Sequence, residues 1–132
     1  MILYVLVGLG GALGSIVRFW LSGLVASQVG ETFPWGTLVI NVSGSFVIGF
    51  FATLTGPDGR VFAGSNARQF VMTGICGGYT TFSSFSIQTL NLARDGEWLR
   101  VAGNIVGSMV FCLVAVWLGH VLATALNQMK GT

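Results

Sequence analysis

Hydrophobic residues fall into four long stretches along the chain, separated by short polar segments. The stretches cover residues 2–27, 35–55, 65–92 and 99–126. Each exceeds the ~20 residues with which a helix crosses ~30 Å of hydrocarbon. The connecting segments are rich in glycine, proline and aspartate, which favour turns. The pattern predicts an all-α membrane protein, a single domain over residues 1–132 with four transmembrane helices.

The composition excludes a soluble protein. Charged residues make up 8% of the chain, against roughly 25% in ordinary globular proteins. The net charge of +2, without any run of basic residues, excludes a nucleic-acid surface. Cys76 and Cys112 stand alone in apolar surroundings, so we expect inert buried thiols and no disulfide framework.

Basic residues are balanced between the two sides of the predicted helix bundle. With four spans, both termini and the 56–64 segment share one side. One side carries Arg60, Arg68 and Lys130, and the other carries Arg94, Arg100 and, if it snorkels outward from the end of the first span, Arg18. This balance gives no orientation under the positive-inside rule. Either a short chain gives a noisy count, or the protein inserts both ways and pairs with an inverted copy of itself.

Glycines recur four residues apart in three of the stretches. The pairs are Gly10/Gly14, Gly74/Gly78 and Gly103/Gly107. Each pair lies on one helix face, where two backbones can approach closely. The run 8–14 also resembles a dinucleotide-binding turn, but it lies inside an apolar span with no strand before it.

The third stretch is longer and more polar than the others. Its centre holds the pair Gly77-Gly78 and six hydroxyl residues: Thr73, Thr80, Thr81, Ser83, Ser84 and Ser86. Each glycine costs about 1 kcal/mol relative to alanine in a helix, so we expect the helix to break at this pair. In lipid, a break persists only where it lines a cavity or holds an ion. The alternative is a kinked helix whose hydroxyls bond back to its own backbone.

Polar and aromatic residues form stripes at helical spacing. The stripes are Thr37, Asn41 and Ser45; Asn104, Ser108 and Cys112; and Phe82 with Phe85. An asparagine in the membrane is often an interhelical hydrogen-bonding residue rather than a transport ligand. Together, however, amide and hydroxyl donors, phenyl edges and helix N-termini suit a small anion.

Ionisable residues are almost absent from the spans. No acidic residue lies inside a span, which argues against a proton-coupled or cation-exporting carrier. Arg18 is either a snorkelling anchor or part of a vestibule. His120, the only histidine, is expected to be a packed side chain. Without a general base beside Ser or Cys, the chain is not expected to be an enzyme.

Four segments resemble the Fluc family of fluoride channels, also called CrcB. They cover residues 10–18, 36–41, 73–86 and 104–108, in an order and spacing that span nearly the whole chain. The most specific is Gly-Gly-x-Thr-Thr-Phe-Ser-x-Phe-Ser at 77–86. The resemblance implies an antiparallel, dual-topology homodimer in the inner membrane of a prokaryote. It also implies two passive pathways per dimer that export fluoride from the cytoplasm.

The resemblance also implies roles for particular residues. Phe82, Phe85, Asn41 and Ser108 would line the fluoride pathway. We add Thr37 of the polar stripe and Thr81 of the hydroxyl-rich segment. The carbonyls of Gly77 and Thr80 are expected to hold a structural sodium ion (Na+) on the dimer axis, and Arg18 matches the arginine of the family's first span.

The chain departs from the family pattern at two positions. Gln88 stands where members often carry glutamate, and Cys112 where they often carry threonine. A different class remains as an alternative, a small dual-topology exporter of organic cations, but such a carrier needs an intramembrane carboxylate. A purely structural membrane subunit would not need a hydroxyl-rich broken helix.

Overall fold

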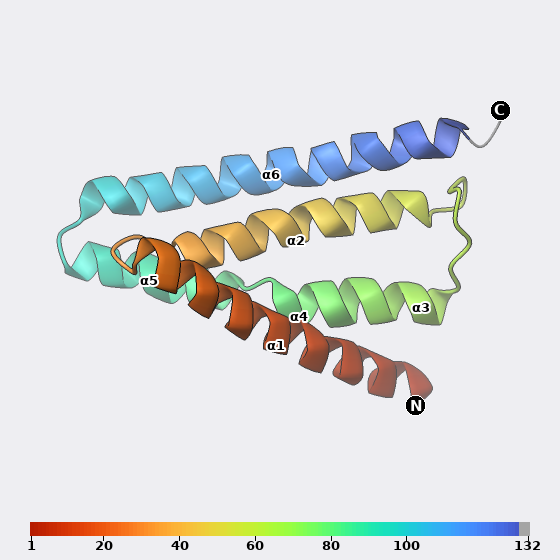
Figure 1. Cartoon of the computed structure of the whole chain (residues 1–132), viewed down its shortest axis with the longest axis horizontal. Coiled ribbons are helices and arrows are strands. Elements are labelled where there is room, and N and C mark those ends of the chain that lie inside the picture. The colour runs from red at the N-terminus through yellow and green to blue at the C-terminus, as the bar shows by residue number, and fades with distance from the viewer. Residues whose placement is uncertain (130–132) are drawn as a thin grey trace.

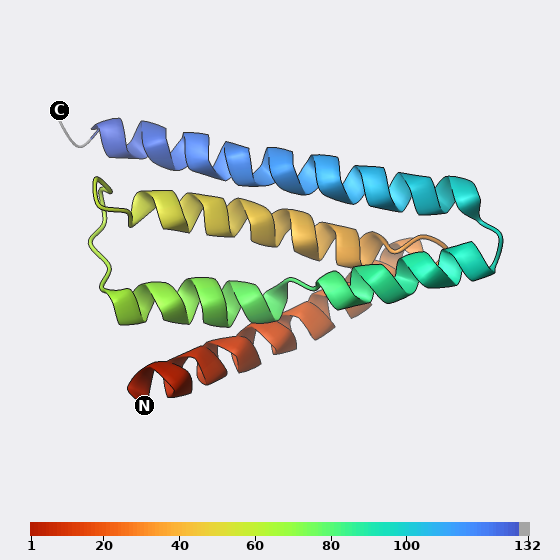
Figure 2. The same cartoon turned by 180° about the vertical axis from the view of Figure 1, so that it is seen from behind.

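The computed structural model describes residues 1–129, and within this range every regular element is helical. The elements are α1 (Ile2–Val29), α2 (Trp35–Leu54), α3 (Ser65–Gln69), the π-helical segment η1 (Phe70–Cys76), α4 (Gly77–Tyr79), α5 (Phe82–Arg94) and α6 (Trp98–Gln128). Helices α6 and α2 run alongside the segments from α3 to α5, and α1 crosses obliquely (Figures 1 and 2). Lys130, one of the basic residues counted above, lies outside the described residues.

Three of the four predicted spans are single helices. Helices α1, α2 and α6 are each long and apolar enough to cross a membrane, so the chain is a multi-pass membrane protein. The start of α1, the 55–64 segment and the end of α6 lie at one end of the molecule (Figure 1). This agrees with the predicted arrangement, in which both termini and that segment share one side.

The third span is broken near its centre, as predicted, but not at the glycine pair. Gly77 has helical dihedrals, φ −64° and ψ −37°. The chain instead becomes extended at Thr80 (φ −81°, ψ 157°) and Thr81 (φ −153°, ψ 111°). β-Branched residues adopt extended backbone readily. The break therefore follows the threonines, and the prediction that placed it at Gly77-Gly78 was wrong by about one helical turn.

The glycines of the third span serve close packing against α1. A Cβ atom added to Gly78 would lie 2.8 Å from the Cα atom of Gly11, and one added to Gly10 would lie 3.0 Å from the Cα atom of Gly74. Two of the three predicted glycine pairs thus lie where two backbones meet. No such approach is made at the third pair, since a Cβ atom on Gly103 would have its nearest neighbour at 4.0 Å.

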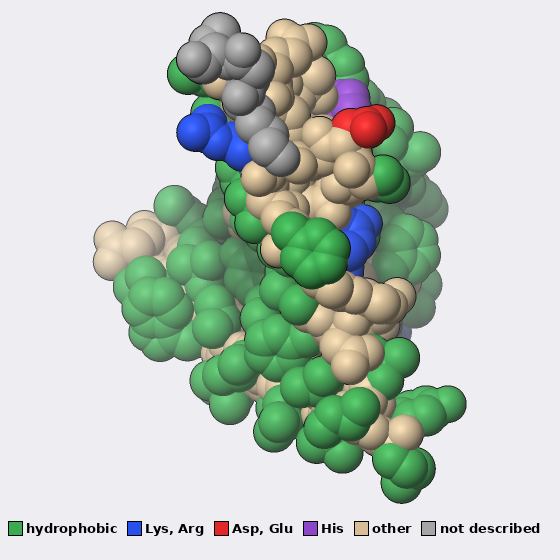
Figure 3. Space-filling model, turned by 90° about the vertical axis from the view of Figure 1, so that its right-hand side faces the viewer, with side chains coloured by type: hydrophobic (Ala, Val, Ile, Leu, Met, Phe, Trp, Pro, Cys, Tyr) green, Lys and Arg blue, Asp and Glu red, His purple; other side chains and the backbone are tan. Residues whose placement is uncertain are grey.

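The core is small and the outer surface is apolar. The buried hydrophobic side chains among the described residues are Ile40, Cys76, Leu92, Ala115 and Ala123. Large apolar residues cover the outside, such as Phe19, 84% exposed, and Leu99, 88% exposed. Figure 3, which looks at the end carrying the N-terminus, shows a mainly hydrophobic surface with few charged side chains. Such a surface fits lipid or a second membrane protein, because exposing it to water would be unfavourable.

His120 was predicted to be a packed side chain, but the structure does not bury it. Its side chain is exposed, and Nδ1 lies 2.8 Å from the hydroxyl oxygen of Thr53. The hydrogen bond links α6 to α2 and explains how an imidazole is accommodated on an otherwise apolar helix.

Candidate functional site

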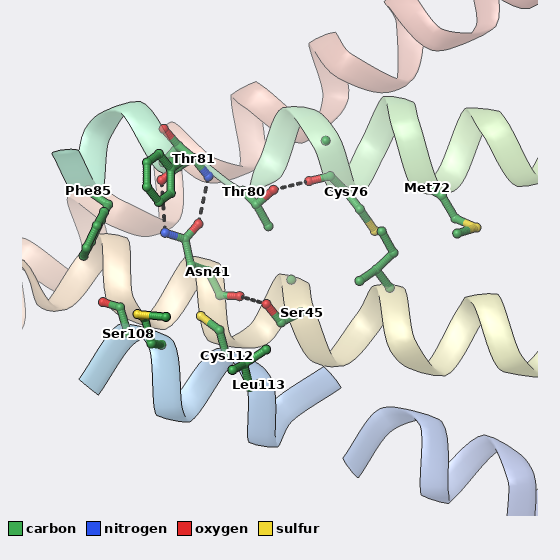
Figure 4. Close-up of a pocket in the computed structure, with 15 residues that line it drawn as sticks. Asn41, Ser45, Met72, Cys76, Thr80, Thr81, Phe85, Ser108, Cys112 and Leu113 are labelled. Atoms are coloured by element: carbon green, nitrogen blue, oxygen red, sulfur yellow. Dashed lines mark hydrogen bonds between the residues drawn. The ribbon is translucent and has the colours of Figure 1, made fainter. Parts of the chain in front are cut away.

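A cavity of about 420 Å³ lies beside the break in the third span. It is bounded by α2, by the η1–α4 segment, by the start of α5 and by the middle of α6 (Figure 4). Seven of the nine predicted site residues line it: Asn41, Gly77, Thr80, Thr81, Phe82, Phe85 and Ser108. The break and the polar stripes therefore converge on one cavity, whose remaining wall is largely apolar.

The side chain of Asn41 holds the backbone at the break. Its Nδ2 donates to the carbonyl oxygen of Thr81 at 3.0 Å, and the Thr81 N–H donates to its Oδ1 at 2.8 Å (Figure 4). One amide from α2 thus supplies the acceptor that the Thr81 N–H has lost, and it adds a donor to the Thr81 carbonyl, which as the N-cap also accepts the first bond of α5. Buried backbone groups need such partners in a low-dielectric environment. Asn41 was predicted as a pathway residue. It lies on the cavity wall, and it also makes these two hydrogen bonds to the backbone at the break.

The break releases the backbone carbonyls of residues 77–80 from their usual helical donors. In a continuous helix, the Thr81 N–H would bond to Gly77 and the Ser84 N–H to Thr80. The first donates to Asn41 instead, and the second donates to Thr81 Oγ1 at 3.1 Å. Gly77 and Thr80, the residues predicted to hold sodium, are thus among those with released carbonyls, and both residues line the cavity.

The first turn of α5 carries the two phenyl rings. Phe82 is 78% exposed and Phe85 is half-buried. Their ring centroids are 5.3 Å apart with the planes inclined by 44°. Thr81 caps this helix by accepting the Ser84 N–H, and the positive end of the helix dipole lies beside the rings. Ring edges and a helix N-terminus both favour negative charge.

On α6, the polar stripe divides between the helix interface and the cavity. Asn104, only 2% exposed, donates from Nδ2 to Thr89 Oγ1 at 2.9 Å, and Ser108 donates to Asn104 Oδ1 at 3.4 Å. Asn104 is therefore the interhelical hydrogen-bonding residue that the sequence left as an alternative. Ser108 and Cys112 line the cavity. Both cysteines are free, Cys76 being buried and Cys112 half-buried.

Two predicted site residues lie away from this cavity. Thr37 is buried and lines a second cavity of about 670 Å³, near the turns that join α1 to α2 and α5 to α6. Arg18 is half-buried on α1 and lines neither cavity. Of the second-span stripe, only Asn41 and Ser45 face the first cavity, where the Ser45 hydroxyl donates to the Asn41 carbonyl at 2.7 Å.

The second cavity contains polar groups that the sequence did not single out as a site. Gln88 was noted only as a departure from the family pattern. Its Oε1 atom is buried without a hydrogen-bond partner among the described residues. Asp95, Glu97 and Arg100 also line this cavity, and Glu97 pairs with Arg100 at 3.4 Å. These residues are far apart in the sequence from Thr37, so no local pattern joined them.

Comparison with known proteins gives concordant matches. The model of the family described as "CrcB-like protein, Camphor Resistance (CrcB)" matches residues 5–120. A fluoride-specific ion channel FluC of Opitutus terrae is 68% identical over 132 residues, the whole of both chains. One of Methylocella silvestris is 64% identical over 97% of this chain and 98% of its own. One of Rhodospirillum rubrum is 66% identical over 95% of this chain and 97% of its own.

Proposed function

We propose that this chain, which belongs to the CrcB family, is a fluoride-selective ion channel. The family is one of ion channels and not of enzymes. The observation that carries the proposal is the cavity at the break. It is lined by five residues of the most specific sequence match (Gly77, Thr80, Thr81, Phe82 and Phe85) together with Asn41 and Ser108. The near-full-length identity to proteins named for fluoride conduction supports the same conclusion.

The cavity wall suits a small, strongly hydrated anion. Ser108 supplies a hydroxyl that would turn from Asn104 Oδ1, at 3.4 Å, to the anion. Phe82 and Phe85 supply ring edges with partial positive charge. No carboxylate lines the described cavity, so its wall adds no formal negative charge. In this proposal the anion exchanges water for hydroxyl and ring-edge contacts while the apolar wall excludes bulk solvent. Thr81, whose hydroxyl caps α5, joins the pathway from the side of the break.

The proposed conduction is passive and directed outward. Hydrogen fluoride crosses lipid uncharged and dissociates in a more neutral cytoplasm, so fluoride accumulates inside. A negative-inside potential then favours exit of the anion by ~2.3 kcal/mol per 100 mV. A passive pore is sufficient for export, and the expected location is the inner membrane of a bacterium.

We further propose that the functional unit is an antiparallel homodimer with two pathways. The support is the balanced distribution of basic residues and the large apolar faces that the single chain leaves uncovered. An inverted partner would bring a second copy of every cavity residue. It would also cover apolar surface that a single chain presents only to lipid.

The neutral oxygens at the break fit a structural sodium ion. The carbonyls of Gly77 and Thr80 have lost their helical donors, and both residues line the cavity. Two such carbonyls from each of two subunits would provide four oxygen ligands for a hard monovalent cation. Sodium held there would satisfy acceptors that are costly to leave free in a membrane. The proposed role is therefore structural.

Fluoride efflux from proteoliposomes tests the proposal. Vesicles loaded with potassium fluoride and containing the purified chain should release fluoride rapidly when valinomycin lets potassium follow. The same vesicles loaded with potassium chloride should retain their chloride, and protein-free vesicles should retain both anions. Absence of protein-dependent fluoride efflux would contradict the proposal, and equal efflux of chloride would contradict its selectivity.

A further inference from the structure

Sulfur side chains gather around the cavity at the break. The chain has two cysteines and four methionines, and both cysteines and two of the methionines line this one cavity. Met72 and Cys76 belong to η1, and Met109 and Cys112 to α6. These sulfur atoms are not suited to contact a hard anion, because thiol and thioether groups are soft ligands that bind soft cations.

The pair on α6 is the better placed of the two. Met109 and Cys112 are three residues apart on a regular α-helix and therefore share one face. Met109 is 60% exposed and Cys112 is half-buried, so neither is committed to the core. Cys112 points from α6 toward α2, near Asn41 and Ser45 (Figure 4).

The pair on η1 is less suited to binding. Cys76 is only 3% exposed. Met72 lies four residues before it in a π-helical segment, so an ion shared by these two sulfur atoms would have to enter the core. The greater exposure of Cys112 therefore favours the pair Met109 and Cys112 as the binding site.

The chemistry of this pair selects one class of ligand. The described residues contain no group of three His, Cys, Asp or Glu side chains that could hold a metal ion, so a site for zinc is not provided. One thiolate and one thioether suit a soft d¹⁰ cation that accepts two sulfur ligands. We propose that Met109 and Cys112 form a binding site for a soft monovalent cation, Cu(I) or Ag(I), and that its occupancy obstructs the cavity.

The binding step involves no change of oxidation state. The Cys112 S–H bond breaks, an S–metal bond forms, and the proton passes to water. The Met109 thioether adds a lone pair to the same ion. Because both residues lie on the cavity wall, the bound cation would narrow the space beside Ser108. The obstruction, though not the binding, rests on the proposed channel function.

Silver binding to the purified full-length chain tests the site directly. The chain in detergent micelles is equilibrated with silver nitrate in chloride-free buffer, and bound silver is measured by mass spectrometry after desalting. We expect about one ion per chain, lost in Cys112→Ala and retained in Cys76→Ala. Met109→Leu should weaken binding at least about tenfold, whereas Met72→Leu, on the opposite wall, should not. Silver retained by Cys112→Ala, or bound equally well by Met109→Leu, would overturn the site.

Fluoride efflux with and without silver tests the obstruction. Each variant is compared with its own silver-free rate, so that any effect of the substitution on basal flux cancels. Silver should slow the wild-type chain at least about fivefold and leave Cys112→Ala unaffected. Bound silver with an unchanged wild-type rate would disprove the obstruction and leave the site standing. Absence of silver-free flux would instead refute the channel proposal, and the binding measurement would still decide the site.

Discussion

Helix α6 and the third span both carry polar residues through the membrane, but only the third span has an interrupted backbone. Helix α6 runs unbroken over Trp98–Gln128, and Asn104 and Ser108 are satisfied through side-chain hydrogen bonds. The third span interrupts its backbone at Thr80 and Thr81 and relies on Asn41 of another helix to bond the freed Thr81 N–H and the Thr81 carbonyl. Polar side chains alone therefore do not break a helix. The break requires a partner, supplied here by one amide of α2.

The largest effect is expected from removing that partner. Asn41→Ala leaves the Thr81 N–H without an acceptor, at about 1–3 kcal/mol for a buried group, and also removes one donor from the Thr81 carbonyl. Because these bonds stabilise the broken conformation, we expect its population, and with it fluoride efflux, to fall by about tenfold or more, since 1.4 kcal/mol corresponds to a factor of ten. Asn104→Ala, which removes a side-chain bond and leaves the α6 backbone intact, should cost less. The measurements are efflux from proteoliposomes and thermal unfolding in detergent. An equal loss in both variants would remove the distinction between the two spans.

The next effect concerns close packing. Gly78→Val places a Cβ atom 2.8 Å from the Cα atom of Gly11, so α1 must shift. Overpacking of this kind costs about 1–3 kcal/mol, and we expect a lower unfolding temperature together with reduced efflux. The matched change on α6 is Gly103→Val, whose nearest neighbour lies at 4.0 Å. If Gly103→Val destabilises the protein as much as Gly78→Val, tight packing is not special to the third span.

A smaller effect is expected at the aromatic rings. Phe82→Ile and Phe85→Ile retain apolar volume but remove the ring quadrupole, whose contacts are worth about 0.5–1.5 kcal/mol each. Each variant should conduct fluoride up to about tenfold more slowly while unfolding at nearly the wild-type temperature. Phe111→Ile on the outer face of α6, where the ring is 55% exposed, serves as the control. Wild-type efflux in both Phe82→Ile and Phe85→Ile would exclude the rings from the conduction mechanism.

The sequence predicted the elements better than it predicted the break. Bilayer thickness fixes the length of an apolar helix, so α1, α2 and α6 follow from hydrophobicity alone. Helix propensity pointed to Gly77-Gly78, whereas the break falls where Asn41 reaches it from 40 residues earlier in the chain. That choice is made by packing and leaves no mark in local composition.

Helical spacing predicted which site residues share a face of one helix, but not which faces meet at the cavity. The stripe on the second span placed Thr37 and Asn41 on one face, but the two lie on different cavities because the break meets only the latter. The sequence placed Cys112 on the stripe with Asn104 and Ser108 and predicted an inert buried thiol, whereas it is half-buried and shares the cavity wall with residues of α2 and α5. Side chains that converge from separate helices are identified only once those helices are packed.

The smallest expected effect concerns the first residues of α5 and of α6. Helix α5 begins beside the break with Thr81 as its cap, and the hydroxyl accepts the Ser84 N–H at 3.1 Å. Loss of such a cap costs typically about 1 kcal/mol, so Thr81→Ala should lower the unfolding temperature slightly, and Thr81→Ser should restore it. The N-cap residue of helix α6 is Glu97, whose side chain makes no capping hydrogen bond. Its pair with Arg100 is about half-exposed and contributes little, because solvent screens exposed ion pairs. Glu97→Ala should therefore leave thermal unfolding almost unchanged. If Glu97→Ala cost as much as Thr81→Ala, the start of α5 would be no more dependent on its cap than an ordinary helix end.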